Sequence, residues 1–301
     1  EIYTLSLHDA LPIWSAPVQV VHLKAREGDR PGMAEHLFSI IERARAEGVD
    51  VTVDQYPYTA ASSTMRSLMP KWVHEGGVAG ILELLSDPVR RGPLHDEMAA
   101  SERWQKCMEH GDGPRGIVLG ELPGTPQYTG MNLEAVAKDM GTDAVDALLE
   151  VILKNQGCDH GVYFTMTEQD IRNVMVNPLV MVGSDGGIAL RGEFVHPRYC
   201  GTFPRVLGRY ARDLKLFSME EGVRKMTSLP ASRLGLTRKG LLRPGMDADM
   251  VLFNPGTIAD GNDYEHPTEP PIGIESVWVA GRLAAHRGRL TDERAGRVLR
   301  F

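Results

Sequence analysis

The sequence has little cysteine, no long apolar run and no cluster of basic residues. Its three cysteines, Cys107, Cys158 and Cys200, lie far apart in the 301 residues and form no Cys-x-x-Cys pair. This usage favours a reducing, cytoplasmic location over a disulfide framework, and it offers no zinc-finger spacing. No apolar run approaches the ~18 residues that a membrane span needs. The formal net charge is −7. We therefore expect neither nucleic acid nor a membrane as a partner, because phosphate backbones favour clustered Lys and Arg.

What the chain does contain is typical of a globular protein. Apolar residues make up 42% of the sequence and charged residues 24%. The length is enough for one large α/β domain or for two smaller domains. Residues 1–14 do not fit this pattern, since they resemble the translation of a sequencing-library adapter more than a signal peptide. We expect them to be a non-native leader and the rest to be part of a longer protein.

The region after this leader alternates between strand and helix patterns. A short apolar run at 17–23 precedes a helical pattern that begins at Met33, and Gly48 is placed to end the helix. An alternating strand pattern follows at 49–54. A βαβ unit of this length indicates a parallel sheet. The carboxyl ends of its strands would bring His22 and Asp54 to the same rim.

The later segments predict an α/β domain followed by a small β domain. Residues 66–116 are less regular, and we expect an excursion from the sheet that could cover a site. A helix at about 142–155, opened by Thr142, a strand at 162–164 and a helix at 168–175 follow, with Thr167 as the N-cap of the last. Ser218 and Glu221 form a capping-box pattern that begins the next helix. The predicted domains are a partial catalytic domain over 15–238 and a β domain over 239–301.

The most informative segment lies around Asp185. A buried strand at 179–182 leads into Gly-Ser-Asp-Gly-Gly at 183–187, and a His-Pro-Arg sequence follows at 196–198. Active sites of parallel α/β proteins lie at the carboxyl ends of the strands. A carboxylate placed there can bind a metal or accept a proton, and the glycines leave room for a ligand. Asp-Gly after a strand is also ordinary turn chemistry, so the motif alone leaves both interpretations open.

Taken together, several segments resemble one family. From about Ala16 to Arg300 the chain is similar to the C-terminal part of the D-aminoacylases, the N-acyl-D-amino-acid deacylases of the amidohydrolase superfamily. The segment 245–253 is shared by amidohydrolases broadly, whereas 196–208 is specific to the deacylases. The matching segments are 21–24, 54–59, 183–186, 196–208, 225–230 and 245–253.

The resemblance implies a fold and a set of roles. The fold is a (β/α)8 (TIM) barrel with strands of a small β-sandwich, and the reaction is the zinc-dependent hydrolysis of an N-acyl-D-amino acid. A metal lowers the pKa of bound water toward ~7, and a carboxylate beside it can take the proton. Asp185 corresponds to the general base and to a ligand of a second metal, and His22 to a zinc ligand. Arg198 and Tyr56 correspond to residues that bind the substrate carboxylate, and Met166 to a wall of the side-chain pocket.

The departures from the family pattern matter equally. The family also needs a His-x-His pair, a cysteine on the second strand and another histidine, none of which can be assigned in this chain. All three cysteines follow His22, so none matches the family cysteine by its order. His22 and Asp185 make two ligands, whereas a catalytic zinc has about three from the protein. We therefore expect the 301-residue chain to be inactive, and its few parallel strands cannot close a barrel.

Two other functions remain open at this point. A cyclic amidase of the hydantoinase or dihydroorotase kind would use the same barrel, although Arg198 suits a free carboxylate and argues against it. A non-catalytic oligomeric scaffold descended from such an enzyme would need no complete site. The sequence does not indicate the acyl group, the substrate side chain or the oligomeric state.

Overall fold

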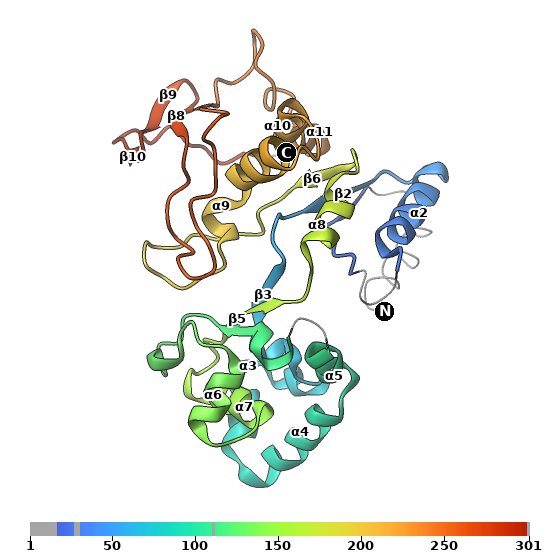
Figure 1. The fold of residues 1–301 in the computed structure, drawn as a ribbon, viewed down its shortest axis with the longest axis vertical. Helices are drawn as coiled ribbons and strands as arrows, with labels where there is room; N and C mark the ends of the chain where they lie inside the picture. Colours follow the sequence, from blue (N-terminus) through green and yellow to red (C-terminus); the bar gives the residue numbers. More distant parts are fainter. Residues whose placement is uncertain (1–16, 27–30, 110–111, 300–301) are drawn as a thin grey trace.

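The computed structural model of the protein describes residues 17–26, 31–109 and 112–299 (Figure 1). The expected leader at 1–14 lies outside these residues. Three parts of the chain can be distinguished along the sequence: a small parallel sheet with its helices, a helical lobe inserted into it, and a C-terminal antiparallel sheet.

The parallel sheet has the order β1-β2-β6, and both of its strand pairs are parallel. In β2, alternate residues are fully buried, which is the pattern of a strand covered on one face. Helix α2 packs Phe38 and Ile41 against Val53 of this strand in one apolar cluster. Parallel α/β pairing is therefore confirmed. The elements are β1 (Val18–Val20), α2 (Met33–Ala46), β2 (Val51–Gln55), α8 (Glu168–Met175) and β6 (Val180–Val182).

Helix α8 begins where the sequence predicts. The Thr167 side chain accepts a hydrogen bond from the Asp170 amide, and the Asp170 carboxylate accepts one from the Thr167 amide. This reciprocal capping box satisfies two backbone donors that a helix start leaves free. The helix at 142–155 begins differently: α7 is capped by Asp143 rather than opened by Thr142.

A lobe formed by residues 60–164 interrupts the chain between β2 and α8 (Figure 1). It leaves the sheet through β3 (Ala60–Thr64) and returns through β5 (His160–Phe164), which pair antiparallel, and β4 (Ile117–Leu119) pairs with β5. Its α-helices are α3 (Gly77–Ser86), α4 (Pro88–Ala100), α5 (Glu102–Glu109), α6 (Leu133–Met140) and α7 (Ala144–Lys154). Its short helices are η1 (Met65–Leu68), η2 (Lys71–Gly76), η3 (Gly113–Gly116) and η4 (Pro126–Tyr128).

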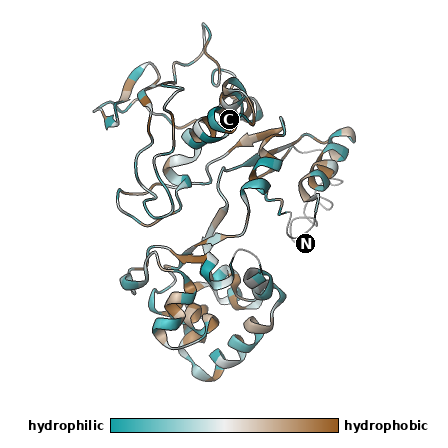
Figure 2. Cartoon of the chain, in the orientation of Figure 1, coloured by the Kyte–Doolittle hydropathy of each residue, from teal (hydrophilic) through white to brown (hydrophobic). Residues whose placement is uncertain are grey.

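The sequence predicts an irregular excursion over 66–116, whereas the lobe is largely helical and extends over 60–164. Three α-helices lie in that range, and the segments at 144–154 and 160–164 belong to the same lobe. Their side chains share the largest apolar cluster of the described residues, including Leu85, Leu148 and Tyr163. Figure 2 shows hydrophobic and hydrophilic residues alternating along the lobe's helices. The glycines at 76–77 and the prolines at 88 and 93 suggested irregular structure, but Gly77 and Pro88 are the first residues of α3 and α4, and Pro93 lies inside α4.

The C-terminal part contains four helical segments and an antiparallel sheet. They are α9 (Arg198–Arg205), the π-helix η5 (Val206–Asp213), α10 (Met219–Met226) and α11 (Ser228–Arg233). The sheet has the order β10-β9-β8-β7, formed by β7 (Met250–Phe253), β8 (Ile274–Val279), β9 (Arg282–His286) and β10 (Arg289–Leu290). Ser218 caps α10 as predicted, but only its own half of the capping box forms, because Glu221 pairs with Arg224. Within the described ranges, no helix combines the length and the apolar character that crossing a membrane requires.

Candidate active site

The candidate site lies at the carboxyl ends of β1, β2 and β6 and in the loops that follow them, which we call the rim. The His22 amide donates a 2.7 Å hydrogen bond to Oδ1 of Asp54, so these residues meet as the strand order predicts. The Gly183 amide donates to the Gln55 carbonyl and holds the end of β6 beside β2. A Cβ on Gly183 would lie 3.3 Å from Asp54, so this close approach favours glycine.

Two predicted site residues have an uncommon backbone conformation. His22 has a φ of 40° and Asp185 a φ of 48°, in the left-handed region that non-glycine residues seldom adopt. Such residues gather at functional sites, where the surrounding contacts hold them in place. For His22 that contact is the bond to Asp54.

Arg198 and Asp185 form an ion pair in which Nη2 lies 3.0 Å from Oδ2. The arginine side chain is 7% exposed and the aspartate side chain 45%. The guanidinium carbon lies 4.8 Å from the centre of the Tyr56 ring, a cation–π arrangement. Among the described residues, nothing hydrogen-bonds Nε or Nη1 of Arg198 or the Tyr56 hydroxyl, although all three atoms are buried. Burial raises the pKa of Tyr56 well above its usual range, so this hydroxyl stays protonated.

Lys24 is a member of the site that the sequence analysis missed. Its Nζ lies 5.1 Å from the centre of the Tyr56 ring and 3.2 Å from Nδ1 of His22. Burial, followed by the charge of Arg198, lowers the pKa of Lys24 to about 8. A signal for it was present: Lys24 follows His22 by two residues, a spacing that places side chains on one face of an extended chain.

The expected role of Met166 in the side-chain pocket stays a prediction, whereas the glycines after Asp185 have different surroundings from those predicted. Met166 packs against an apolar cluster that includes Val182 and Tyr210. Added Cβ atoms on Gly186 and Gly187 would lie 3.0 Å from Tyr199. These glycines therefore accommodate the first turn of α9, rather than leaving room for a ligand as the sequence suggested.

His196 is buried behind Arg198, and both of its ring nitrogens are hydrogen-bonded. Nδ1 accepts from the Arg198 amide at 3.0 Å, and Nε2 lies 3.0 Å from the Ala60 carbonyl. Because an amide only donates and a carbonyl only accepts, these partners select the neutral tautomer protonated at Nε2. Burial, with the charge of Arg198, lowers the pKa of His196 to about 3.

The described residues do not form a complete metal site at the rim. His22 and Asp185 belong to no group of three His, Cys, Asp or Glu ligands within residues 17–26, 31–109 and 112–299. A lysine ammonium only donates, so Nδ1 of His22 accepts from Lys24 in this arrangement. The residues present therefore do not by themselves fit a catalytic zinc, which takes about three protein ligands.

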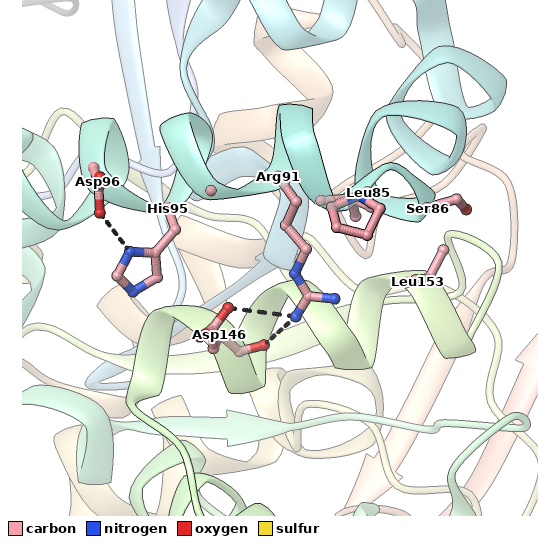
Figure 3. Close-up of a pocket in the computed structure, with 9 residues that line it drawn as sticks. Leu85, Ser86, Arg91, His95, Asp96, Asp146 and Leu153 are labelled. Carbon is pink, nitrogen blue, oxygen red and sulfur yellow. Dashed lines mark hydrogen bonds and ion pairs between the residues drawn. The ribbon is translucent and has the colours of Figure 1, made fainter.

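A group of three possible ligands does occur elsewhere, in the lobe. His95, Asp143 and Asp146 lie together. Two of them, His95 and Asp146, line a surface pocket that Arg91 also lines (Figure 3). Each carboxylate already has a structural role, since Asp143 caps α7 and Asp146 pairs with Arg91. Because α4 and α7 lie far from the rim (Figure 1), this group is not part of the candidate site.

Comparison with known proteins identifies the chain's relatives. A sequence profile of the amidohydrolase family matches residues 143–285. The D-aminoacylase of Alcaligenes xylosoxydans xylosoxydans is 34% identical over 283 residues, which are 94% of this chain and 48% of that protein. The profile match over 143–285 and the similarity to D-aminoacylase over nearly the whole chain relate it to the amidohydrolase family. An N-acyl-D-glutamate deacylase of the same organism is 33% identical over 86% of this chain and 43% of its own length.

Solved structures agree with this assignment. A crystal structure of a D-aminoacylase matches with a TM-score of 0.74 and 31% identity, covering 99% of this chain and 53% of that one. The N-acyl-D-glutamate deacylase from Bordetella bronchiseptica, solved with zinc and a phosphonate inhibitor, matches with a TM-score of 0.72 and 27% identity. The match includes 95% of this chain and 51% of that deacylase. The predicted family and fold class, part of an amidohydrolase barrel, are therefore confirmed.

The same comparisons limit what this chain represents. It spans about half the length of the curated relatives and solved structures that it matches. Another matching D-aminoacylase is described as having a binuclear metal centre, so the expected one or two zinc ions agree with the metals of the relatives.

Proposed function

We propose that this chain supplies the substrate-carboxylate site and the general base of a zinc-dependent N-acyl-D-amino-acid deacylase. The chain's relatives include D-aminoacylase and the deacylases of N-acyl-D-aspartate and N-acyl-D-glutamate. The substrate is accordingly a small molecule with a free carboxylate next to an acylated nitrogen. Hydrolysis yields a carboxylate and a free D-amino acid.

The buried guanidinium of Arg198 is the observation that carries this proposal. A buried donor without a partner costs about 1–3 kcal/mol, and more when it is charged, so a protein keeps one for a reason. Two nitrogens of Arg198 and the Tyr56 hydroxyl have this property within the described chain. A substrate carboxylate would satisfy them, because a guanidinium suits its geometry. Lys24, whose Nζ lies 5.1 Å from the centre of the Tyr56 ring, adds a second positive charge.

Asp185 is suited to be the proton acceptor in this arrangement. It is the exposed member of the ion pair with Arg198, so water can reach it. A carboxylate there can take a proton from the attacking water and return it to the leaving amine. We assign Met166 to the wall of the substrate side-chain pocket. Zinc in the whole protein then requires ligands additional to His22 and Asp185, and the isolated chain would be inactive.

Two alternatives are less well supported. A cyclic amidase acts on a substrate without a free carboxylate, and the unpaired nitrogens of Arg198 would then lack a purpose. A non-catalytic scaffold gives no reason to bury nitrogens of Arg198 without partners. We also propose a cytoplasmic location, which the free thiols of Cys158 and Cys200 support.

The test uses the chain extended upstream to the length of its relatives. We expect that protein to release acetate from N-acetyl-D-alanine and not from the L-isomer, and we expect Asp185→Asn to lower kcat at least 100-fold, about the contribution of a general base. An extended protein that hydrolyses a cyclic amide and leaves N-acetyl-D-alanine intact would replace this function with the cyclic amidase.

A further inference from the structure

His196 lies between the substrate site and the place where the lobe joins the sheet. Its Nδ1 accepts a hydrogen bond from the Arg198 amide, and its Nε2 donates one to the carbonyl of Ala60, the first residue of β3. Arg198 is the first residue of α9, whose N-cap, Pro197, provides no side-chain hydrogen bond. The His196 ring thus satisfies an amide that a helix start otherwise leaves free.

The first and last residues of the lobe lie close to His196. Ala60 begins the lobe and Phe164 ends it, and they are register partners. Tyr264 lies against both, accepting a 3.2 Å hydrogen bond from the Ala60 amide and stacking 4.6 Å from Phe164. The Tyr264 ring is also 5.5 Å from the His196 ring. These residues form what we call the root of the lobe.

The segment between β7 and β8 holds the root in place. We call residues 257–272, which include Tyr264, the strap. Asn262 of the strap donates hydrogen bonds to the carbonyls of Pro197 and Pro267, at 2.8 and 2.7 Å. A Cβ on Gly201 would lie 2.2 Å from the Asn262 side chain, so α9 and the strap are in close contact. The strap therefore holds the backbone on the C-terminal side of His196.

We propose that His196 is a positioning residue, which fixes Arg198 for the substrate carboxylate and ties its position to the root of the lobe. This rests on the proposed function, because it takes Arg198 as the carboxylate ligand. A change in the direction in which the lobe leaves the sheet moves the Ala60 carbonyl. His196 transmits that movement to the first turn of α9, since the same rigid ring bonds both.

Two substitutions separate the two hydrogen bonds. His196→Asn keeps an acceptor near the position of Nδ1, for the Arg198 amide, and loses the donor to Ala60. His196→Gln reaches the position of Nε2 and keeps the donor to Ala60, but loses the acceptor. Both variants replace the ring with a neutral amide side chain that can accept and donate, so they serve as controls for each other. Arg198→Met tests the premise that the arginine binds the carboxylate.

The first measurement is amide hydrogen exchange in the chain extended upstream to the length of its relatives. We expect His196→Gln to speed exchange of the Arg198 amide by about fivefold, the equivalent of one ordinary hydrogen bond. We expect His196→Asn to leave that exchange unchanged and instead to shift the NMR signal of the Ala60 carbonyl carbon, which loses its hydrogen-bond donor. Identical exchange in the two variants would contradict separate roles for the two nitrogens and would overturn the proposal.

The second measurement is the affinity of the same proteins for N-acetyl-D-alanine and for N-acetyl-D-alaninamide, which lacks the carboxylate. We expect His196→Gln to weaken binding of the acid by about fivefold and to leave the affinity for the amide unchanged. We expect His196→Asn to retain the wild-type preference for the acid over the amide. Equal weakening of both ligands means that His196 only packs the core, which overturns positioning. If Arg198→Met leaves the preference for the acid intact, the proposed carboxylate site is wrong and positioning fails with it. An effect of Arg198→Met without one of His196→Gln overturns positioning alone.

Discussion

The lobe and the rim use their buried residues in different ways. The lobe encloses the largest apolar cluster of the described residues, where Leu148 and Val151 are completely buried. The parallel sheet has smaller clusters. Buried polar atoms without a hydrogen-bond partner in the described chain occur in both parts: in the lobe they belong to Arg66 and Asp159, which form an ion pair with each other, and near the rim they include atoms of Tyr56 and Arg198. The lobe is organised for its own stability, whereas the rim keeps unsatisfied groups that a ligand can use.

The largest effect is expected from opening a cavity in the lobe. Leu148→Ala removes a completely buried side chain and should lower the free energy of unfolding of the lobe by about 3 kcal/mol. Urea unfolding measures this change. Val89→Ala, at a side chain that is 82% exposed in α4 of the same lobe, is the control and should change it by less than about 0.5 kcal/mol. Equal effects would mean that the lobe lacks a core of its own.

A pH-dependent effect is expected at His196. An unfolded histidine has a pKa of about 6.5, and burial lowers the pKa of His196 to about 3 in the folded protein. The unfolded state therefore binds the proton first. The contribution to stability is fully present above about pH 6.5 and is lost by up to about 1.4 kcal/mol per pH unit as the pH falls toward 3.

His196→Gln removes this titration, so its free energy of unfolding should fall less steeply between pH 6.5 and pH 4 than that of the wild type. Urea midpoints at several pH values measure the two slopes. Parallel slopes would show that the His196 ring is accessible to protons in the folded protein.

A smaller effect is expected at the start of α8. Thr167→Ala removes the N-cap and should lower the free energy of unfolding by about 1 kcal/mol. Because α8 packs on the parallel sheet, the loss should appear in hydrogen exchange of β6 and not in that of α7. Equal exchange changes in both would indicate that lobe and sheet unfold as one unit.

The smallest effect on stability is expected where the effect on binding is largest. Arg198→Met replaces a buried, incompletely paired charge with an apolar chain of similar size, and it leaves Asp185 with access to water. The free energy of unfolding should change by less than about 1 kcal/mol, or increase. Thermal unfolding measures it. A loss above about 3 kcal/mol would mean that Arg198 stabilises the fold rather than awaiting a ligand.

The parallel sheet could be predicted from local patterns. The alternating strand at 51–55, the helix after Met33 and the Thr167 cap all depend on neighbouring residues, and so they were found. The helices of the lobe were not predicted because Gly77, Pro88 and Pro93 are typical of turns, whereas here they begin α3, begin α4 and lie inside α4. The strand at 160–164 has an ordinary pattern that does not reveal which sheet it joins.

Part of the candidate site could be predicted in the same way. Asp185 and Arg198 lie in a recognisable segment, and the structure pairs them. The hydrogen bond from His196 to the Ala60 carbonyl joins residues 136 positions apart, and the one from the Ala60 amide to Tyr264 joins residues 204 positions apart. Contacts of this kind depend on the complete fold, and no spacing in the sequence indicates them.

The most direct test of the proposed function compares this chain with its upstream-extended form for zinc content and for hydrolysis of N-acetyl-D-alanine. We expect the 301-residue chain to release no acetate. We expect the extended protein to hold one or two zinc ions, as a catalytic site would, and to release acetate. An extended protein without zinc or activity would contradict the account, because Asp185 and Arg198 would then be a structural ion pair in a scaffold.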